Sequence, residues 1–143
     1  MFESATLPVV GTQSELGSKE RASIVVPVYN EAKNLPKFLE SLDALELPCE
    51  KELILVNDCS HDGSRLLLEA FDFKSSVVLI HQTQNQGKGS AIRSGLAAAT
   101  GTIIGIQDAD FEYDMMEIPS LLEPILLHQA DVVYGSRYLR TEM

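Results

Sequence analysis

The amino-acid sequence predicts an α/β fold with a mostly parallel sheet and helices on both faces. Short β-branched runs alternate with helically spaced apolar residues from about Ala22 onward, and a polar stretch follows each run. Repeated alternation of this kind is typical of parallel sheets with right-handed crossovers. The length of 143 residues, with 45% hydrophobic and 22% charged residues, fits a single globular domain that can bury a real core.

Five segments have the apolar, β-branched pattern of buried strands, and four segments between them have helical spacing. The expected strands are Ser23–Val28, Glu52–Asn57, Val77–His81, Thr102–Gln107 and Asp131–Tyr134. Two expected helices are Arg65–Phe71 and Pro119–Gln129, and the other two have the apolar faces Leu35, Phe38, Leu39, Leu42, Leu45 and Ala91, Ile92, Gly95, Leu96, Ala99. Asp62 and Ser64 stand where an N-cap would begin a helix, and Gly101 stands where a C′ glycine would end one.

Charge and composition exclude several classes of protein. The net charge of −10 argues against nucleic acid or an anionic membrane as the main partner, because both require a basic face. Cys49 and Cys59 lack metal-ligand spacing and fit reduced thiols in a cytoplasmic protein. Two cysteines alone do not exclude a single disulfide between them. Residues 1–20 show no signal-peptide pattern and are expected to be a flexible leader before a domain at 21–143. No apolar run is long enough to span a bilayer.

The acidic triplet Asp108-Ala109-Asp110 directly follows the fourth expected strand. Alternation along an extended segment would place both carboxylates on the same side. Two carboxylates at that spacing can share a hard divalent cation, Mg²⁺ or Mn²⁺. Such a metal typically carries the diphosphate of a nucleotide. A solvated acidic turn is the commoner explanation of an isolated D-x-D. The other strand ends are therefore needed to distinguish a metal site from such a turn.

All the expected strand ends are polar, and the carboxyl ends of parallel strands are where such folds bind ligands. The segments at these ends are Pro27-Val28-Tyr29-Asn30-Glu31, residues 57–64, Asn85-Gln86-Gly87-Lys88-Gly89, residues 108–114 and Gly135-Ser136-Arg137. Each segment carries a group suited to a nucleotide, and this coincidence is stronger than any single motif. Familiar alternatives fail: there is no Walker A loop, no G-x-G-x-x-G after the first strand, and no Gly or Glu at the EF-hand positions after Asp108.

Taken in order, these motifs resemble a family 2 glycosyltransferase of the GT-A fold. The segments are Val25–Glu31, Val56-Asn57-Asp58 with Asp62-Gly63-Ser64, Asn85–Gly89, Gln107–Asp110 and Gly135–Arg137. The stretches from Gln107 to Asp114 and from Ala130 to Arg137 are similar to the dolichyl- or polyprenyl-phosphate mannosyltransferase branch. The resemblance covers residues 23–138, so it extends over nearly the whole expected domain.

The resemblance implies a role for each matching residue. The nucleotide-sugar-binding residues would be Pro27, Tyr29, Glu31, Asp58, Lys88, Asp108 and Ala109; the metal ligands for Mg²⁺ or Mn²⁺ would be Asp108, Asp110 and Glu112; the catalytic residues would be Asp110 and Arg137. Family members often carry Asp where this chain has Asn57. Asp62, Ser64 and Asp114 are better explained as helix-terminal residues. Strand-end packing is the alternative for Pro27 and Tyr29, and a surface loop cation is the alternative for Lys88.

By resemblance, the protein would move a sugar from a nucleoside-diphosphate sugar of the GDP-mannose or UDP-glucose type to an acceptor such as a polyprenyl or dolichyl phosphate. It would then be cytoplasmic and work at the membrane face. Family enzymes continue well beyond position 143, so the expected fold is a donor-binding half that is incomplete at its C-terminus, and a homodimer is one way to cover it. Two alternatives remain: a non-catalytic nucleotide-binding domain, and a nucleotidyltransferase, whose Gly-rich N-terminal loop is absent.

Overall fold

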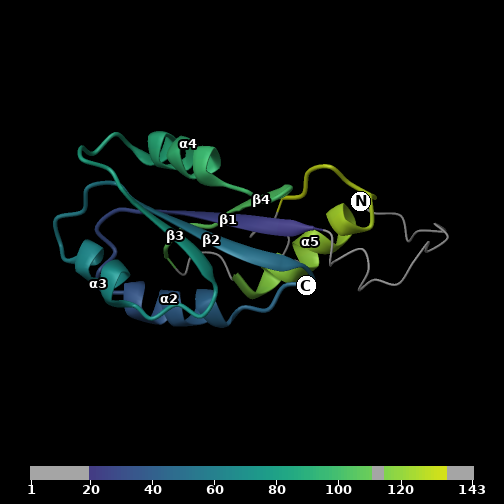
Figure 1. Cartoon of the computed structure of the whole chain (residues 1–143), viewed down its shortest axis with the longest axis horizontal. Coiled ribbons are helices and arrows are strands. Elements are labelled where there is room, and N and C mark those ends of the chain that lie inside the picture. Colours follow the sequence, from purple (N-terminus) through teal and green to yellow (C-terminus); the bar gives the residue numbers. More distant parts are fainter. Residues whose placement is uncertain (1–19, 111–114, 135–143) are drawn as a thin grey trace, which may run out of the picture.

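The computed structural model describes residues 20–110 and 115–134, in which four parallel strands form one sheet (Figure 1). The strands are β1 (Arg21–Val28), β2 (Glu50–Asn57), β3 (Ser76–His81) and β4 (Ile103–Ile106). They lie in the order β3-β2-β1-β4, and all three neighbouring pairs are parallel. The first four predicted strands and the parallel sheet are therefore confirmed.

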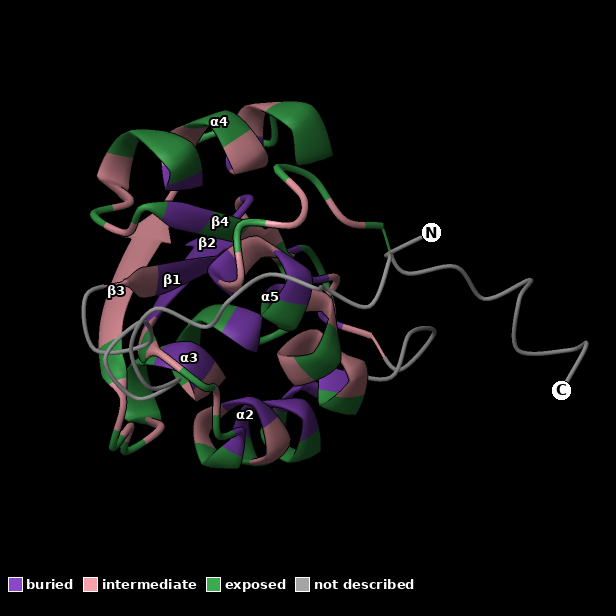
Figure 2. Cartoon of the chain, turned by 90° about the vertical axis from the view of Figure 1, so that its right-hand side faces the viewer, coloured by how far each residue is buried: buried purple, intermediate pink, exposed green. Residues whose placement is uncertain are grey.

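Helices cover both faces of the sheet, as the sequence predicts. They are α2 (Leu35–Ala44), α3 (Ser64–Ala70), α4 (Lys88–Ala98) and α5 (Ile118–Leu126), with a short 3₁₀ helix, η1 (Met115–Glu117), ahead of α5. In Figure 1 and Figure 2, α4 lies alone on one face, whereas α2, α3 and α5 lie on the other. The main core joins alternate side chains of β1 and β2 to these three helices, and a smaller cluster around Val25 and Ala91 packs beneath α4.

The predicted fifth strand, Asp131–Tyr134, is wrong. This segment is irregular, and the side chains of Val132 and Tyr134 are 64% and 87% exposed. β-propensity mainly measures how a side chain packs against a neighbouring strand, and within the described part of the chain no strand pairs with this one. The β-branched run alone therefore does not produce a strand.

Two predicted helix ends are also corrected. The N-cap of α3 is Gly63, with φ of 94° and no side-chain cap, rather than Asp62 or Ser64. Gly101 has no positive φ and ends no helix. Instead, a Cβ atom there would lie 2.5 Å from the Arg21 carbonyl oxygen and 2.6 Å from Ser23 Oγ. Glycine stands at this position because two backbones approach closely.

Helix α5 ends earlier than expected because His128 takes the role usually filled by glycine. His128 adopts φ of 58°. The Gln129 N–H donates to the Pro124 carbonyl at 2.8 Å, and the His128 N–H donates to Ile125 at 3.0 Å. This is the Schellman arrangement that closes a helix C-terminus. Within the described ranges, no helix is long and apolar enough to cross a membrane.

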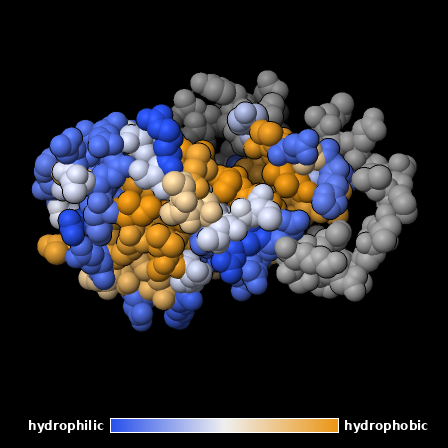
Figure 3. Space-filling model, turned by 45° about the horizontal axis from the view of Figure 1, so that its top comes forward, coloured by the Kyte–Doolittle hydropathy of each residue, from blue (hydrophilic) through white to orange (hydrophobic). Residues whose placement is uncertain are grey.

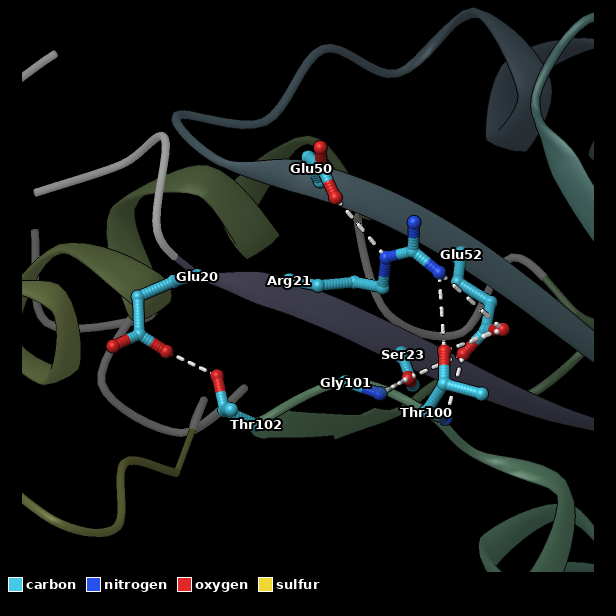
Figure 4. Close-up of polar contacts among 8 residues, drawn as sticks. All are labelled: Glu20, Arg21, Ser23, Glu50, Glu52, Thr100, Gly101 and Thr102. Atoms are coloured by element: carbon cyan, nitrogen blue, oxygen red, sulfur yellow. Dashed lines mark hydrogen bonds and ion pairs between the residues drawn. The ribbon is translucent and has the colours of Figure 1, made fainter. Parts of the chain in front are cut away.

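The amino-terminal edge of the sheet is held by a buried carboxylate, Glu52, the third residue of β2 (Figure 4). Its oxygens accept hydrogen bonds from Ser23 Oγ at 2.7 Å and from the Thr100 backbone and hydroxyl at 3.0 Å each. Ser23 Oγ in turn accepts the Gly101 N–H at 2.8 Å. The network ties the turn before β4 to β1 and β2, and so sets where β4 begins.

One face of β4 carries uncovered apolar side chains. Ile104 and Ile106 are 41% and 54% exposed. They lie beside Ser23 and Val25 in the sheet, and therefore on the α4 side. Figure 3 shows apolar surface gathered on this side of the molecule.

Candidate functional site

Four loops meet at the carboxyl-terminal edge of the sheet, where parallel α/β folds bind ligands. The loops after β1 and β2 are joined by side chains that accept backbone N–H groups. The donor–acceptor pairs are Asn30 N to Ser60 Oγ (3.0 Å), Glu31 N to Ser64 Oγ (3.1 Å), Ala32 N to Asp62 Oδ2 (2.9 Å) and His61 N to Asn30 Oδ1 (2.8 Å). Asp62 and Ser64 therefore connect two loops of this edge, and Asp62 Oδ1 also accepts the N–H of Ser64, the first residue of α3, at 3.1 Å.

Asp58 joins the loop after β2 to the loop after β3. Its side chain is buried at 3% exposure. Oδ1 accepts the Gln86 N–H and Oδ2 accepts the Gly87 N–H, both at 2.9 Å. Gly87, with φ of 93°, is the N-cap residue of α4. The carboxylate that the resemblance assigns to the base thus also shapes the loop that leads into α4.

Lys88 connects the loop after β3 to the loop after β4. It is the first residue of α4, and its ammonium forms an ion pair with Asp108 Oδ1. The Lys88 side chain is 58% exposed and that of Asp108 is 26% exposed. The cation predicted to meet a diphosphate and one of the carboxylates predicted to hold a metal therefore lie together at the surface.

The pKa of Glu31 is affected by several acidic side chains at this edge. Burial raises the pKa of its carboxyl group, and the nearby carboxylates of Asp110, Asp62 and Asp108 raise it further. A carboxylate disfavours ionisation of another carboxyl group when the two lie close together. Three loops thus present acidic oxygens to a common region, beside the Lys88 ammonium. Such a region suits a cation or a cation-bound anion.

The other predicted residues have different environments. Tyr29 is 43% exposed directly after β1, and Pro27 is half-buried within it. Ala109 is 4% exposed and packs in the main core. Glu112, Asp114 and Arg137 lie outside the described residues. Among the residues that are described, no group of three or more His, Cys, Asp or Glu side chains could hold a metal ion.

Sequence reasoning missed a second layer of polar residues behind the loops. Asn57, only 2% exposed, bonds to the His81 ring and to the Ser60 backbone. His81 ends β3, and its position at a strand end was the available signal. Glu52 was missed as well, although a charged residue opening the apolar run of β2 is itself unusual.

Comparison with solved structures places the fold among GT-A glycosyltransferases. The mannosyltransferase PcManGT from Pyrobaculum calidifontis, solved with GDP-Man and Mn²⁺, is 25% identical with a TM-score of 0.62, over 78% of this chain and 33% of that one. S. aureus TarS 1-349, solved with UDP-GlcNAc, is 27% identical with a TM-score of 0.62, over 72% of this chain and 31% of that one. The fold thus defines the class of this protein as the GT-A glycosyltransferase fold.

The family model described as glycosyl transferase family 2 matches residues 23–143, and the chain belongs to this family. Its curated relatives include a dolichol-phosphate mannosyltransferase of Pyrococcus furiosus, 30% identical over 84% of this chain and 34% of the relative. An undecaprenyl-phosphate 4-deoxy-4-formamido-L-arabinose transferase of Pseudomonas fluorescens is 40% identical over 73% of this chain and 32% of the relative. The chain therefore spans about a third of the length of these relatives.

Proposed function

We propose that this chain is the donor-binding part of a glycosyltransferase that moves a sugar from a nucleoside-diphosphate sugar to a polyprenyl or dolichyl phosphate. The observation that carries the proposal is the charge arrangement at the carboxyl-terminal edge. Asp108 pairs with Lys88 there, and Asp110, Asp62 and Asp108 all act on the pKa of Glu31. A nucleoside diphosphate bound with a divalent cation complements both signs of charge.

The donor would lie across the loops that follow β1, β2 and β3. The base and ribose would be contacted by Pro27, Tyr29, Glu31 and Asp58. The exposed side chain of Tyr29 is accessible for such a contact. Lys88 would meet the diphosphate as a point charge. Ala109 would contribute its backbone, and Arg137 would face a phosphate with its bidentate guanidinium.

Asp108 and Asp110 fit a site for Mg²⁺ or Mn²⁺, with Glu112 as the third proposed ligand. Magnesium commonly uses one or two carboxylates and completes its shell with substrate phosphates and water, so two protein ligands are enough to begin such a site. The raised pKa of Glu31, due first to burial and then to the nearby carboxylates of Asp110, Asp62 and Asp108, supports this proposal because it indicates that these acidic groups lie near one another. When bound, the metal would neutralise charge on the departing diphosphate.

A lipid phosphate is the proposed acceptor because the names of two relatives include dolichol phosphate and undecaprenyl phosphate. A phosphate oxygen is already anionic near neutral pH, and it can attack the anomeric carbon without a strong general base. The acceptor would bring the protein to the cytoplasmic face of the membrane as a peripheral enzyme. Since the chain spans about a third of the relatives' length, a further segment or a second copy would complete the acceptor side.

The test is calorimetric titration of the 143-residue chain with GDP-mannose and with UDP-glucose, each with and without Mn²⁺. We expect metal-dependent binding of one donor, which Asp110→Asn abolishes. Asp72→Asn, an exposed carboxylate just beyond the end of α3, is the matched control and should bind like the wild type. Binding of neither donor by a chain that melts cooperatively would contradict the proposal. Sugar transfer to a polyprenyl phosphate would then separate an active enzyme from a nucleotide-binding domain.

A further inference from the structure

Behind the proposed nucleotide site, a chain of hydrogen bonds runs through the ends of three strands. His81 Nδ1, at the end of β3, lies 3.1 Å from Asn57 Nδ2, at the end of β2. Asn57 Oδ1 accepts the Ser60 N–H at 3.1 Å, and Ser60 Oγ accepts the Asn30 N–H at 3.0 Å, just after β1. The ring of a titratable residue is thus connected to two of the loops that we assign to the donor.

The donor and acceptor of each bond in this chain can be assigned from the backbone N–H groups. A backbone N–H only donates, so the Asn57 atom that faces Ser60 must be the amide oxygen. The amide nitrogen then faces His81, and His81 Nδ1 must be an acceptor. The neutral ring therefore carries its proton on Nε2, which lies 3.4 Å from Glu69 Oε1.

Protonation of His81 is incompatible with this arrangement. The imidazolium is a donor at both nitrogens, so a donor would face the Asn57 amide donor across the same contact. Asn57 is only 2% exposed, and rotating its amide group would turn an N–H toward the Ser60 N–H. Either way a buried polar group loses its hydrogen-bond partner, which is unfavourable.

Burial and the neighbouring Arg65 cation favour the neutral form of the His81 ring. Burial lowers the pKa of His81, and the Arg65 cation lowers it further, against the opposite effect of Glu69. Glu69 is a weak counter-ion for His81 because its Oε1 also forms an ion pair with Arg65 Nε at 2.7 Å. Of the elements that pack against β3, α3 supplies this pair and β2 supplies the uncharged amide. Helix α4, with Lys88 and Arg93, covers the opposite face of the sheet.

We propose that His81 is a positioning residue for the donor site, which it supports in the neutral form and releases when protonated. The inference rests on the proposed function, because the loops in question are those assigned to the nucleotide. Neutral His81 orients the Asn57 amide, which holds the turn at Ser60. Asp58, next to Asn57, holds the loop at Gln86 and Gly87. Nucleotide affinity should therefore fall as the pH falls through the titration of His81.

Two amide variants separate the acceptor from the rest of the ring. In His81→Asn, the amide oxygen replaces Nδ1 and accepts the Asn57 N–H at every pH. In His81→Gln, the amide nitrogen can replace Nε2 near Glu69, but the acceptor at Nδ1 is lost. His61→Asn is the control for an ordinary exposed histidine in the same region.

The experiment measures GDP and UDP affinity of the full chain between pH 5.5 and 7.5, with an amide NMR titration of Ser60 and of the Asn57 side chain. We expect the wild type and His61→Asn to lose nucleotide affinity at low pH. The loss should be about tenfold for each unit by which nucleotide binding lowers the pKa of the His81 ring. His81→Asn should bind at pH 7.5 like the wild type and lose this dependence. His81→Gln should bind weakly throughout.

The wild-type pH dependence persisting in His81→Asn would overturn the inference. Ser60 and Asn57 amides that do not shift as the His81 ring titrates would overturn it independently of any nucleotide. If no variant binds either nucleotide at any pH, the proposed function fails and the role of His81 in the donor site fails with it. In that case the amide titration still decides whether His81 controls the turn.

Discussion

Glu52 and Glu31 are the same residue type at opposite edges of one sheet, and their pKa values shift in opposite directions. Burial alone would raise the pKa of Glu52, but hydrogen bonds from Ser23 and Thr100, together with the Arg21 charge, hold it below its usual value. For Glu31, burial raises the pKa and neighbouring carboxylates add to the effect. The difference lies in whether the fold supplies donors or further acids.

The two edges therefore have different roles. At the amino-terminal edge, the carboxylate is satisfied by this chain's own groups, and the network holds β1, β2 and the start of β4 together (Figure 4). At the carboxyl-terminal edge, the carboxylates of Asp62, Asp108 and Asp110 lie near Glu31, and Lys88 pairs with Asp108. We expect the first arrangement to stabilise the fold and the second to support the cation binding that we propose.

The largest effect that would test this contrast is on stability. Glu52→Gln should lower the free energy of unfolding by about 2 kcal/mol, because it weakens charge-assisted bonds to buried donors. Glu50→Gln removes the other Arg21 partner, whose side chain is 60% exposed, and should change stability by less than about 0.5 kcal/mol. Urea denaturation at pH 7 measures both. Equal effects of the two variants would show that burial of Glu52 contributes nothing.

Two glycines, one at each edge, differ in how closely other atoms approach them. Gly101→Ala should destabilise by about 1–3 kcal/mol, because its Cβ would meet the Arg21 carbonyl and Ser23 Oγ. Gly89→Ala, in α4, has no atom within 4 Å of the added Cβ and should be neutral or slightly stabilising. Thermal unfolding compares them. We also expect Gly89→Ala to weaken nucleotide binding, since the methyl group would obstruct the approach of a diphosphate to this backbone.

The pH dependence of stability should differ in sign between the two glutamates. The lowered pKa of Glu52 stabilises the fold above its unfolded value of about 4.5, and this contribution is lost as the pH falls through the lower folded value. The raised pKa of Glu31 acts oppositely: it favours the fold in acid and opposes it as the pH rises through the folded value. Melting temperatures of Glu52→Gln and Glu31→Gln from pH 3 to 7 test this. Glu52→Gln should flatten the acid-side decline, and Glu31→Gln should steepen it; identical profiles would contradict the contrast.

The smallest expected effect is stabilisation by metal alone. Mn²⁺ at ten times its dissociation constant would stabilise the fold by about 1.4 kcal/mol. It should also lower the pKa of Glu31, because a nearby cation favours the carboxylate. Melting with Mn²⁺, and an NMR titration of Glu31 with diamagnetic Mg²⁺, measure the two effects. Asp108→Asn should reduce both, whereas Glu52 should titrate unchanged with or without metal.

Much of the fold could be predicted because its signals are local. The β-branched runs that became β1 to β4 and the apolar spacing of α2 and α4 follow from backbone periodicity. Errors fell where a local pattern depends on a distant partner. Asp131–Tyr134 has the residues of a strand but no paired neighbour among the described strands, and Gly101 resembles a helix-ending glycine but is needed where β1 passes close by.

The candidate site divides in the same way. The sequence by itself placed polar residues at each strand end, because the chain must leave a buried strand there, and the order of the motifs identified the family. Only the tertiary structure decided which of those residues support the loops: Asp58 holds the loop after β3, Asp62 and Ser64 hold the loop after β1, and His81 orients Asn57. Their partners lie 24 to 33 residues away in the sequence. Local periodicity carries no information at that separation, and only packing of the strands side by side brings these groups within bonding distance.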